Sequence, residues 1–148
     1  MSKLLAIEVD ARGLIAALDR LGAEAEQYVK AAAKVTAENI AREARARVAR
    51  RTGETAAHIV AEETHDGKGY VVWVDPDVKL SLHTSKRSGR THTQKVTYNA
   101  LGGWLEFGTQ HMTARPFLFV SARLEEGAHD QRTRAAVQAA IDAVGLGE

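Results

Sequence analysis

ARGLIAALDRLGAEAEQYVKAAAKVTAENIAREARARVARR, residues 11–51, is a long helical pattern, and it decides the fold. Its apolar residues recur at steps of three and four, which places them on one stripe of an amphipathic helix. Gly22 is expected to divide a short helix from a long one, since glycine costs about 1 kcal/mol relative to alanine within a helix. Thr52 and Gly53 are expected to end the long helix. The predicted stripe consists of Leu14, Leu18, Leu21, Ala25, Tyr28, Ala32, Val35, Asn39 and Val48.

The residues on both sides of this stretch have the pattern of strands. Before it, residues 4–9 alternate imperfectly between apolar and other residues, and Asp10 offers a side-chain oxygen that can cap the next helix. After it, residues 57–64 and 70–75 are rich in β-branched and aromatic residues. A turn over residues 65–69 separates them, so we expect a β-hairpin.

The most basic part of the chain follows this hairpin. Residues 78–82 and 94–98 are expected to form short strands, joined by a polar loop of about a dozen residues, and such a loop is more often functional than merely connective. Residues 77–98 contain five basic side chains and one acidic side chain. We therefore expect residues 79–95 to be a flexible basic loop that contacts a partner ring or DNA. The candidate contact residues are Lys79, Lys86, Arg87, Arg90 and Lys95.

A sharp turn is expected after Phe107. Gly108 allows a positive backbone φ there, which lets the chain turn toward residues 110–112. The Thr109 hydroxyl can cap this turn.

The C-terminal part predicts a second main helix. Pro116 is expected in its first turn, where the missing N–H is harmless. Phe117 and Phe119 lie two positions apart, so they cannot both face one core. Either one of them contacts another subunit, or both cover the sheet of their own domain. The order of elements indicates a single α+β domain over residues 1–148, a small mainly antiparallel β-sheet packed against a long N-terminal helix and a C-terminal helix.

The composition excludes several classes of protein. The 148 residues include 20 Lys and Arg, 19 Asp and Glu and no Cys, and 26 of the 66 hydrophobic residues are Ala. The core is therefore modest, and a disulfide scaffold, a thiolate zinc site and a cysteine nucleophile are excluded. No apolar run approaches the roughly 18 residues of a spanning helix, and no signal-peptide pattern is present. We expect synthesis in the cytoplasm and no membrane association.

Candidates for catalysis are few. The six histidines form neither an i, i+4 helical pair nor an H-E-x-x-H motif, so we expect no metal site and no cofactor. Glu106 is the one acid within an apolar segment, and Arg115 is its expected ion-pair partner. The sequence therefore predicts no catalytic residues and no enzyme. The histidines are His58, His65, His83, His92, His111 and His129.

Three motifs follow one another along the chain. They are a TG pair at residues 52–53 before a strand that opens at Ile59, YNA at residues 98–100 leading to EFGT at residues 106–109, and ARPFL at residues 114–118. This order resembles the tail-component family of long-tailed bacteriophages, whose members join or complete the head–tail neck. With the N-terminal helical stretch included, the resemblance spans nearly the whole chain.

The resemblance implies a structural virion protein that forms a hexameric ring between the head connector and the tail tube. Its role would be tail completion, head–tail joining or tail termination. It implies three partners, namely the head-closure or connector protein, the tail-tube protein and the packaged DNA in the channel. The expected subunit or ring interface consists of Glu106, Phe107, Gly108, Thr109, Arg115, Pro116 and Phe117.

Two other functions agree with the same residues. A nucleic-acid-binding module would use the basic residues 79–95, and its affinity for duplex DNA would fall steeply with salt. A small hydrolase would use Glu106 as its acid, and replacement of that residue by glutamine would then abolish turnover. The alternatives for the basic residues therefore include DNA and protein partners.

Overall fold

The computed structural model describes residues 5–13, 15, 19, 22–50, 53–76, 79–87 and 90–143, and for residue 24 and residues 79–95 it describes the backbone only. Leu14, Leu18, Leu21 and Thr52 of the predicted elements lie outside the described residues. The elements in chain order are β1 (Ala6–Asp10), α2 (Ala23–Arg47), α3 (Glu54–Ala57), β2 (Ile59–Glu63), β3 (Gly69–Val74), β4 (Lys79–Arg87), β5 (Arg90–Thr97), α4 (Tyr98–Phe107) and α5 (Leu118–Ala143).

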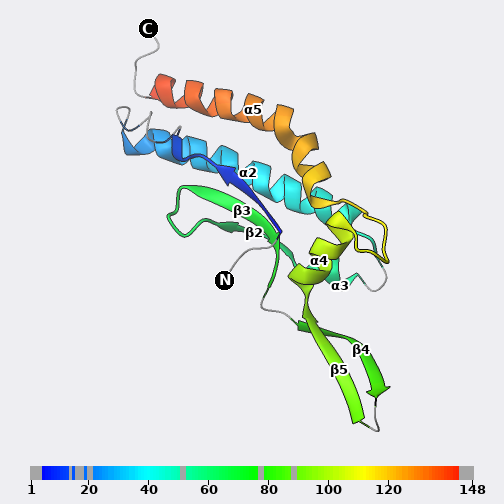
Figure 1. Cartoon of the computed structure of the whole chain (residues 1–148). Coiled ribbons are helices and arrows are strands. Elements are labelled where there is room, and N and C mark those ends of the chain that lie inside the picture. Colours follow the sequence, from blue (N-terminus) through cyan, green and yellow to red (C-terminus); the bar gives the residue numbers. More distant parts are fainter. Residues whose placement is uncertain are drawn as a thin grey trace.

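The structure confirms the predicted α+β fold. Three antiparallel strands form a sheet in the order β1-β3-β2, and α2 lies between this sheet and α5 (Figure 1). Val72 at the centre of β3 is paired with Ile7 of β1 and with Ala61 of β2. The predicted hairpin is confirmed as β2 and β3. No helix among the described residues is long and apolar enough to span a membrane.

The buried face of α2 differs from the predicted stripe. Ala25, Ala32 and Val48 are buried as expected, but Tyr28 and Val35 are 41% and 43% exposed. The prediction followed the larger apolar side chains, whereas alanine lets the helix approach both of its neighbours closely. The additional buried positions are Val29, Ala33, Thr36, Ala37, Ile40, Ala41 and Ala44.

Glycine marks the start of α2, but not its end. Gly22 precedes the helix with φ 92°, which agrees with the predicted division. The helix ends at Arg47, earlier than predicted, and Gly53 with φ 84° instead precedes the short helix α3. Arg45 ties the last turn of α2 to the sheet, because its Nε and Nη2 atoms donate hydrogen bonds to the Ile59 carbonyl at 3.0 and 2.7 Å.

The strands predicted at residues 78–82 and 94–98 correspond to the start of β4 and the end of β5, but the prediction of a loop between them, within residues 79–95, is wrong. β4 and β5 pair along this segment as an antiparallel two-stranded sheet, with Lys79 opposite Thr97 and Arg87 opposite Arg90. The polar composition suggested a loop, but its repeated threonines have a high strand propensity. The hairpin projects from the rest of the chain beyond α4 (Figure 1).

Helix α4 occupies a segment for which a strand end was predicted at Tyr98. Thr97 begins the helix, because its hydroxyl accepts a hydrogen bond from the Ala100 amide at 3.1 Å. Asn99 is buried and donates to the Val74 carbonyl at 2.9 Å. A Cβ atom on Gly102 would lie 2.9 Å from Val74 Cγ2, so this glycine allows α4 to approach the end of β3.

Candidate subunit interface

Gly108 turns the chain at the end of α4. Its φ of 76° lies in a region that glycine adopts most readily, as predicted for this position. A Cβ atom here would lie 2.7 Å from the Met112 carbonyl oxygen and 2.8 Å from the Ala114 amide nitrogen. Both the backbone conformation and the available space therefore require glycine. The turn at Gly108 sets the direction in which the chain leaves α4.

The turn after Gly108 is closed by hydrogen bonds. The Thr109 amide donates to the Met112 carbonyl at 2.8 Å, and the Thr109 hydroxyl accepts from the His111 amide at 3.2 Å, which confirms its predicted capping role. The Arg115 amide then donates to the Leu105 carbonyl at 2.7 Å. This bond brings the chain back alongside α4 before α5 begins.

Glu106 holds the N-terminus of α5. The side chain is buried, and its Oε2 atom accepts hydrogen bonds from the amides of Phe117 and Leu118 at 2.8 and 2.9 Å. Its Oε1 atom accepts from the Phe119 amide at 3.1 Å. The first amides of a helix lack partners within the helix, and the helix dipole favours a negative charge beside them. Glu106 therefore joins the end of α4 to the start of α5.

The predicted ion pair between Glu106 and Arg115 is wrong. The salt bridges among the described side chains do not join these two residues, and Arg115 is exposed. The expectation assumed that a buried carboxylate needs a cationic side chain, whereas three backbone amides satisfy this one. Pro116 also lies before α5 rather than in its first turn.

The two phenylalanines at this junction face in different directions, as their spacing predicted. Phe117 is fully buried in the core, whereas Phe119 is 39% exposed. The ring of Phe119 contacts that of Phe107, with a centroid distance of 5.8 Å and an interplanar angle of 49°. Phe107 is 64% exposed. We call this exposed pair, Phe107 and Phe119, the junction surface.

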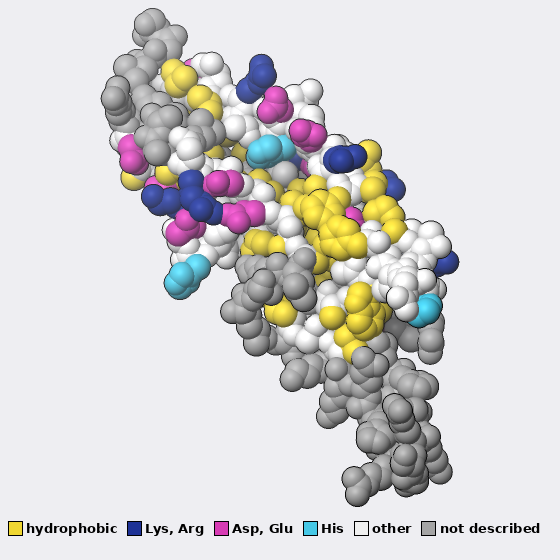
Figure 2. Space-filling model, viewed as in Figure 1, with side chains coloured by type: hydrophobic (Ala, Val, Ile, Leu, Met, Phe, Trp, Pro, Cys, Tyr) yellow, Lys and Arg dark blue, Asp and Glu magenta, His cyan; other side chains and the backbone are white. Residues whose placement is uncertain are grey.

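The predicted interface residues thus divide into a buried and an exposed group. Glu106 and Phe117 lie inside the chain and support the junction surface from beneath, while Thr109, Arg115 and Pro116 are exposed around it. Figure 2 shows hydrophobic side chains gathered on the surface where α4 ends and α5 begins. Sequence reasoning did not single out Leu124, which is 59% exposed, because one leucine in the polar stretch around it carries no periodic signal.

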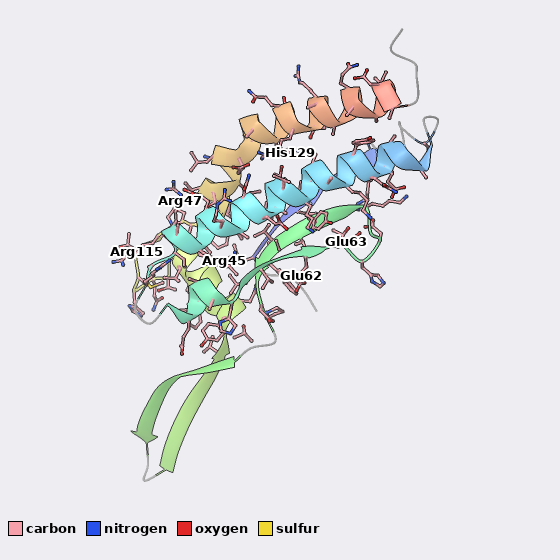
Figure 3. All side chains as sticks on the ribbon, turned by 180° about the vertical axis from the view of Figure 1, so that it is seen from behind. Arg45, Arg47, Glu62, Glu63, Arg115 and His129 are labelled. Carbon is pink, nitrogen blue, oxygen red and sulfur yellow. The ribbon has the colours of Figure 1, made fainter. Side chains whose placement is uncertain are left out.

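A groove of about 280 Å³ lies between β1, α2 and α5. His129 on α5 faces α2 (Figure 3), and its Nδ1 atom lies 3.0 Å from the Thr36 hydroxyl oxygen. Glu125 forms a salt bridge with Arg132. Thr36 and His129, which both line this groove, therefore join the two long helices. Within the described part of the chain, no group of three or more His, Asp or Glu residues could hold a metal ion.

The other described histidines lie apart from His129. His58 stacks on Tyr98 with ring centroids 4.1 Å apart. The Tyr98 hydroxyl donates to Glu54 Oε2 at 3.0 Å, and burial together with this bond raises the pKa of the phenol above its ordinary value. The side chains of His83 and His92 lie outside the described part.

The sheet has an outer face, opposite α2, on which acidic residues gather. Successive residues of β2 point to opposite faces, so Glu63 reaches Lys30 of α2 at 2.8 Å while Glu62 lies on the outer face (Figure 3). Glu62 accepts a hydrogen bond from the Trp73 indole at 3.2 Å. Arg12 forms salt bridges with three carboxylates near this face, those of Glu8, Asp10 and Asp66.

The structure describes only the backbone of the five predicted basic contact residues. These residues are Lys79, Lys86, Arg87, Arg90 and Lys95. Their backbone belongs to the β4–β5 hairpin, which α4 separates from the junction surface. The structure thus separates the two sets of predicted contact residues into a hairpin and a helix junction.

The sequence model of one protein family matches this chain. The family is described as "Bacteriophage HK97-gp10, putative tail-component", and the match covers residues 12–108, more than half of the chain. The matched region includes α2, the β2–β3 hairpin, the β4–β5 hairpin and α4 with Glu106 and Gly108. No curated protein and no solved structure matches the chain.

Proposed function

The chain belongs to the HK97-gp10-like family of bacteriophage tail components, and from this premise we propose that it is a non-catalytic structural protein of the phage neck. In this role, copies of the chain form a ring, hexameric in keeping with the motif resemblance, between the head connector and the tail tube. The ring contacts the head-closure or connector protein and the tail-tube protein. It assembles in the bacterial cytoplasm and remains in the virion neck.

The observation that carries this proposal is the junction surface. The rings of Phe107 and Phe119 contact each other, yet Phe107 is 64% exposed and Phe119 is 39% exposed. Large aromatic side chains usually bury most of their area. The pair rests on a rigid support, because Glu106 and Gly108 define how α4 meets α5. A rigid exposed aromatic group surrounded by polar residues is typical of the centre of a protein interface.

A ring also agrees with the composition of the core. Many of the buried side chains are alanines, each of which buries little apolar area. Burial of further apolar surface between subunits would therefore add to the stability of the assembled protein. Head-to-tail contacts that use two different surfaces on each copy close into rings when the rotation between copies permits.

The direct test is electron microscopy of phage particles assembled without this protein. If the protein joins heads to tails, complete heads and complete tails will accumulate separately. If it terminates the tail, tails of irregular length will appear. Normal virions, or virions that never contain the protein, would contradict the proposed neck role.

Removal of the junction surface is expected to prevent assembly without unfolding the chain. We expect Phe107→Ser combined with Phe119→Ser to weaken association of copies by roughly tenfold or more, since aromatic residues at the centre of interfaces contribute most of the binding energy. Sedimentation velocity over a concentration series measures this association, and urea unfolding shows that the fold persists.

The matched control for the junction surface is Tyr28→Ser combined with Val35→Ser on α2. These side chains are 41% and 43% exposed, so the control removes a comparable amount of exposed apolar surface elsewhere. Equal association of the junction variant and the wild type, or equal losses in the junction and α2 variants, would contradict the assignment of this interface.

One sequence feature favours a second candidate function, a nucleic-acid-binding module. Residues 79–97 contain five Lys or Arg and no acidic residue. This candidate predicts that the isolated chain binds duplex DNA with an affinity that falls steeply as salt rises. The neck proposal predicts weak binding by a single subunit, so fluorescence anisotropy with labelled duplex DNA distinguishes the two.

A further inference from the structure

We propose that the β4–β5 hairpin of one copy docks on the outer face of the three-stranded sheet of a second copy. The inference rests on the proposed ring, for which it names a contact between neighbouring subunits. It assigns a protein partner to the hairpin, whose basic composition alone is equally compatible with DNA.

The hairpin has little packing against the described residues of its own chain. Its principal packing within the described residues is that of β5 against α4, and it extends away from the three-stranded sheet (Figure 1). A two-stranded sheet is marginally stable alone in water, and three strands or a packed face are usually needed. The unpaired strand edges are also available for pairing with another chain. Docking on a second copy would provide this missing support.

The outer face of the sheet offers a surface for the hairpin. The core residues Val72 and Val74 of β3 face α2, while Val71 and Trp73 alternate to the opposite side. A hollow of about 530 Å³ lies on this side between β1 and the β2–β3 turn, and its lining includes Glu8, Asp66 and Val71. Trp73 is partly exposed whereas Val71 is buried, so the face combines a partly exposed aromatic side chain with carboxylates, which suits a polar, basic hairpin.

The charges of the two surfaces are opposite. Residues 79–97 carry five basic side chains and no acidic one. The outer side of the sheet and the β2–β3 turn carry four carboxylates, those of Glu8, Asp10, Glu62 and Asp66, with Arg12 and Lys68 as the cations. Arg12 is one guanidinium shared among three carboxylates, so negative charge remains in excess there. Complementary potentials of this kind favour correct association and orientation.

The same chain supplies both charges, and this favours a second copy over DNA. Each copy brings one basic hairpin and one acidic sheet, so every hairpin in a ring meets a matching face. The chain as a whole has a net charge of only +1, unlike the strongly basic proteins that bind nucleic acid without sequence preference. The hairpin points away from the sheet of its own chain, so the contact is between copies.

Disulfide trapping tests this contact directly, because the chain contains no cysteine. One full-length variant carries Ser85→Cys in β4, and another carries Val60→Cys in β2. When the two are mixed and oxidised, we expect a mixed disulfide dimer that exceeds the amount formed by the control mixture about tenfold, since the contact raises the effective concentration of the two thiols. In the control mixture, the Ser85→Cys variant is combined with a variant that carries Ala135→Cys, at an exposed position of α5.

Charge reversal gives an independent readout. We expect Arg87→Glu with Arg90→Glu to weaken association of copies about tenfold or more, and Glu62→Lys with Glu8→Lys to do the same, because each creates like charges across the contact. A mixture of the hairpin variant with the sheet variant should recover association. Urea unfolding of each variant separates a lost contact from a lost fold.

The outcomes separate this inference from the proposed function. Equal trapping in the test and control mixtures would overturn docking of the hairpin on the sheet. Hairpin variants that lose binding to duplex DNA while their association is unchanged would also overturn it, in favour of a DNA contact. Normal virions that never contain the protein would overturn the neck proposal. Disulfide trapping uses only the purified chain, so it would still show whether the hairpin docks on the sheet of a second copy.

Discussion

Replacement of Glu106 by alanine is expected to destabilise the chain by about 3–4 kcal/mol, since it leaves three amides at the start of α5 without an acceptor. An unsatisfied buried amide costs about 1–3 kcal/mol, and water can reach the Phe119 amide, which lowers the sum. The favourable interaction of the carboxylate with the helix dipole is lost as well. Denaturation with guanidinium, followed by circular dichroism, measures the change.

Two further variants show whether the effect belongs to this carboxylate. Glu106→Gln retains one oxygen acceptor and should lose about half as much stability as the alanine variant. Glu126→Ala, at an exposed position of α5, should change the free energy of unfolding by less than about 0.5 kcal/mol. Wild-type stability of Glu106→Ala would show that these hydrogen bonds do not hold the junction. A stable Glu106→Gln variant that loses turnover of a substrate would instead revive the hydrolase alternative.

Replacement of Phe117 by alanine is expected to cost about 3–5 kcal/mol, because the side chain is fully buried and its removal leaves a cavity. The core around it is rich in alanine, so few large side chains can move to fill the space. Thermal and urea unfolding of the purified chain measure the loss. The particles assembled with this variant should show the same defect as those without the protein, because the chain no longer folds stably.

Phe119→Ala is the matched control, two residues further along the chain. Its side chain is 39% exposed, so we expect a loss of stability below about 2 kcal/mol together with weaker association of copies. Together the two substitutions separate folding from assembly. Equal losses of stability at both positions would mean that Phe119 belongs to the core and that the junction surface is not available to a partner.

Local patterns predicted the parts of the fold that depend on neighbouring residues. The β2–β3 hairpin was predicted from two strand-forming runs and a short turn between them. Gly22 was predicted to divide two helices because glycine is unfavourable within a helix, and Gly108 was predicted to form a sharp turn because glycine readily adopts a positive φ. The order of the three motifs along the chain also led to the family that the sequence model shows.

Predictions that required knowledge of distant partners were less successful. Glu106 was predicted to form an ion pair with Arg115, because a charged side chain can be read from the sequence. The backbone amides of α5 that bind Glu106 cannot be read in this way, since their position depends on the fold. In α2 the prediction included Ala25 and Ala32 but chose Tyr28 and Val35 over the other alanines, which close helix packing buries. The central part of the β4–β5 hairpin was predicted as a loop because its residues are polar, although strands were predicted at both of its ends.

The sequence by itself therefore determined the α+β class, the β2–β3 hairpin, the turn at Gly108 and the family of the chain. These features depend on backbone preferences and periodicities that operate over a few residues. Only the tertiary structure decided which face of α2 is buried, what Glu106 binds and which phenylalanine remains on the surface. Each of these is set by contacts between segments far apart in the chain, and the energy of such contacts depends on their arrangement in space.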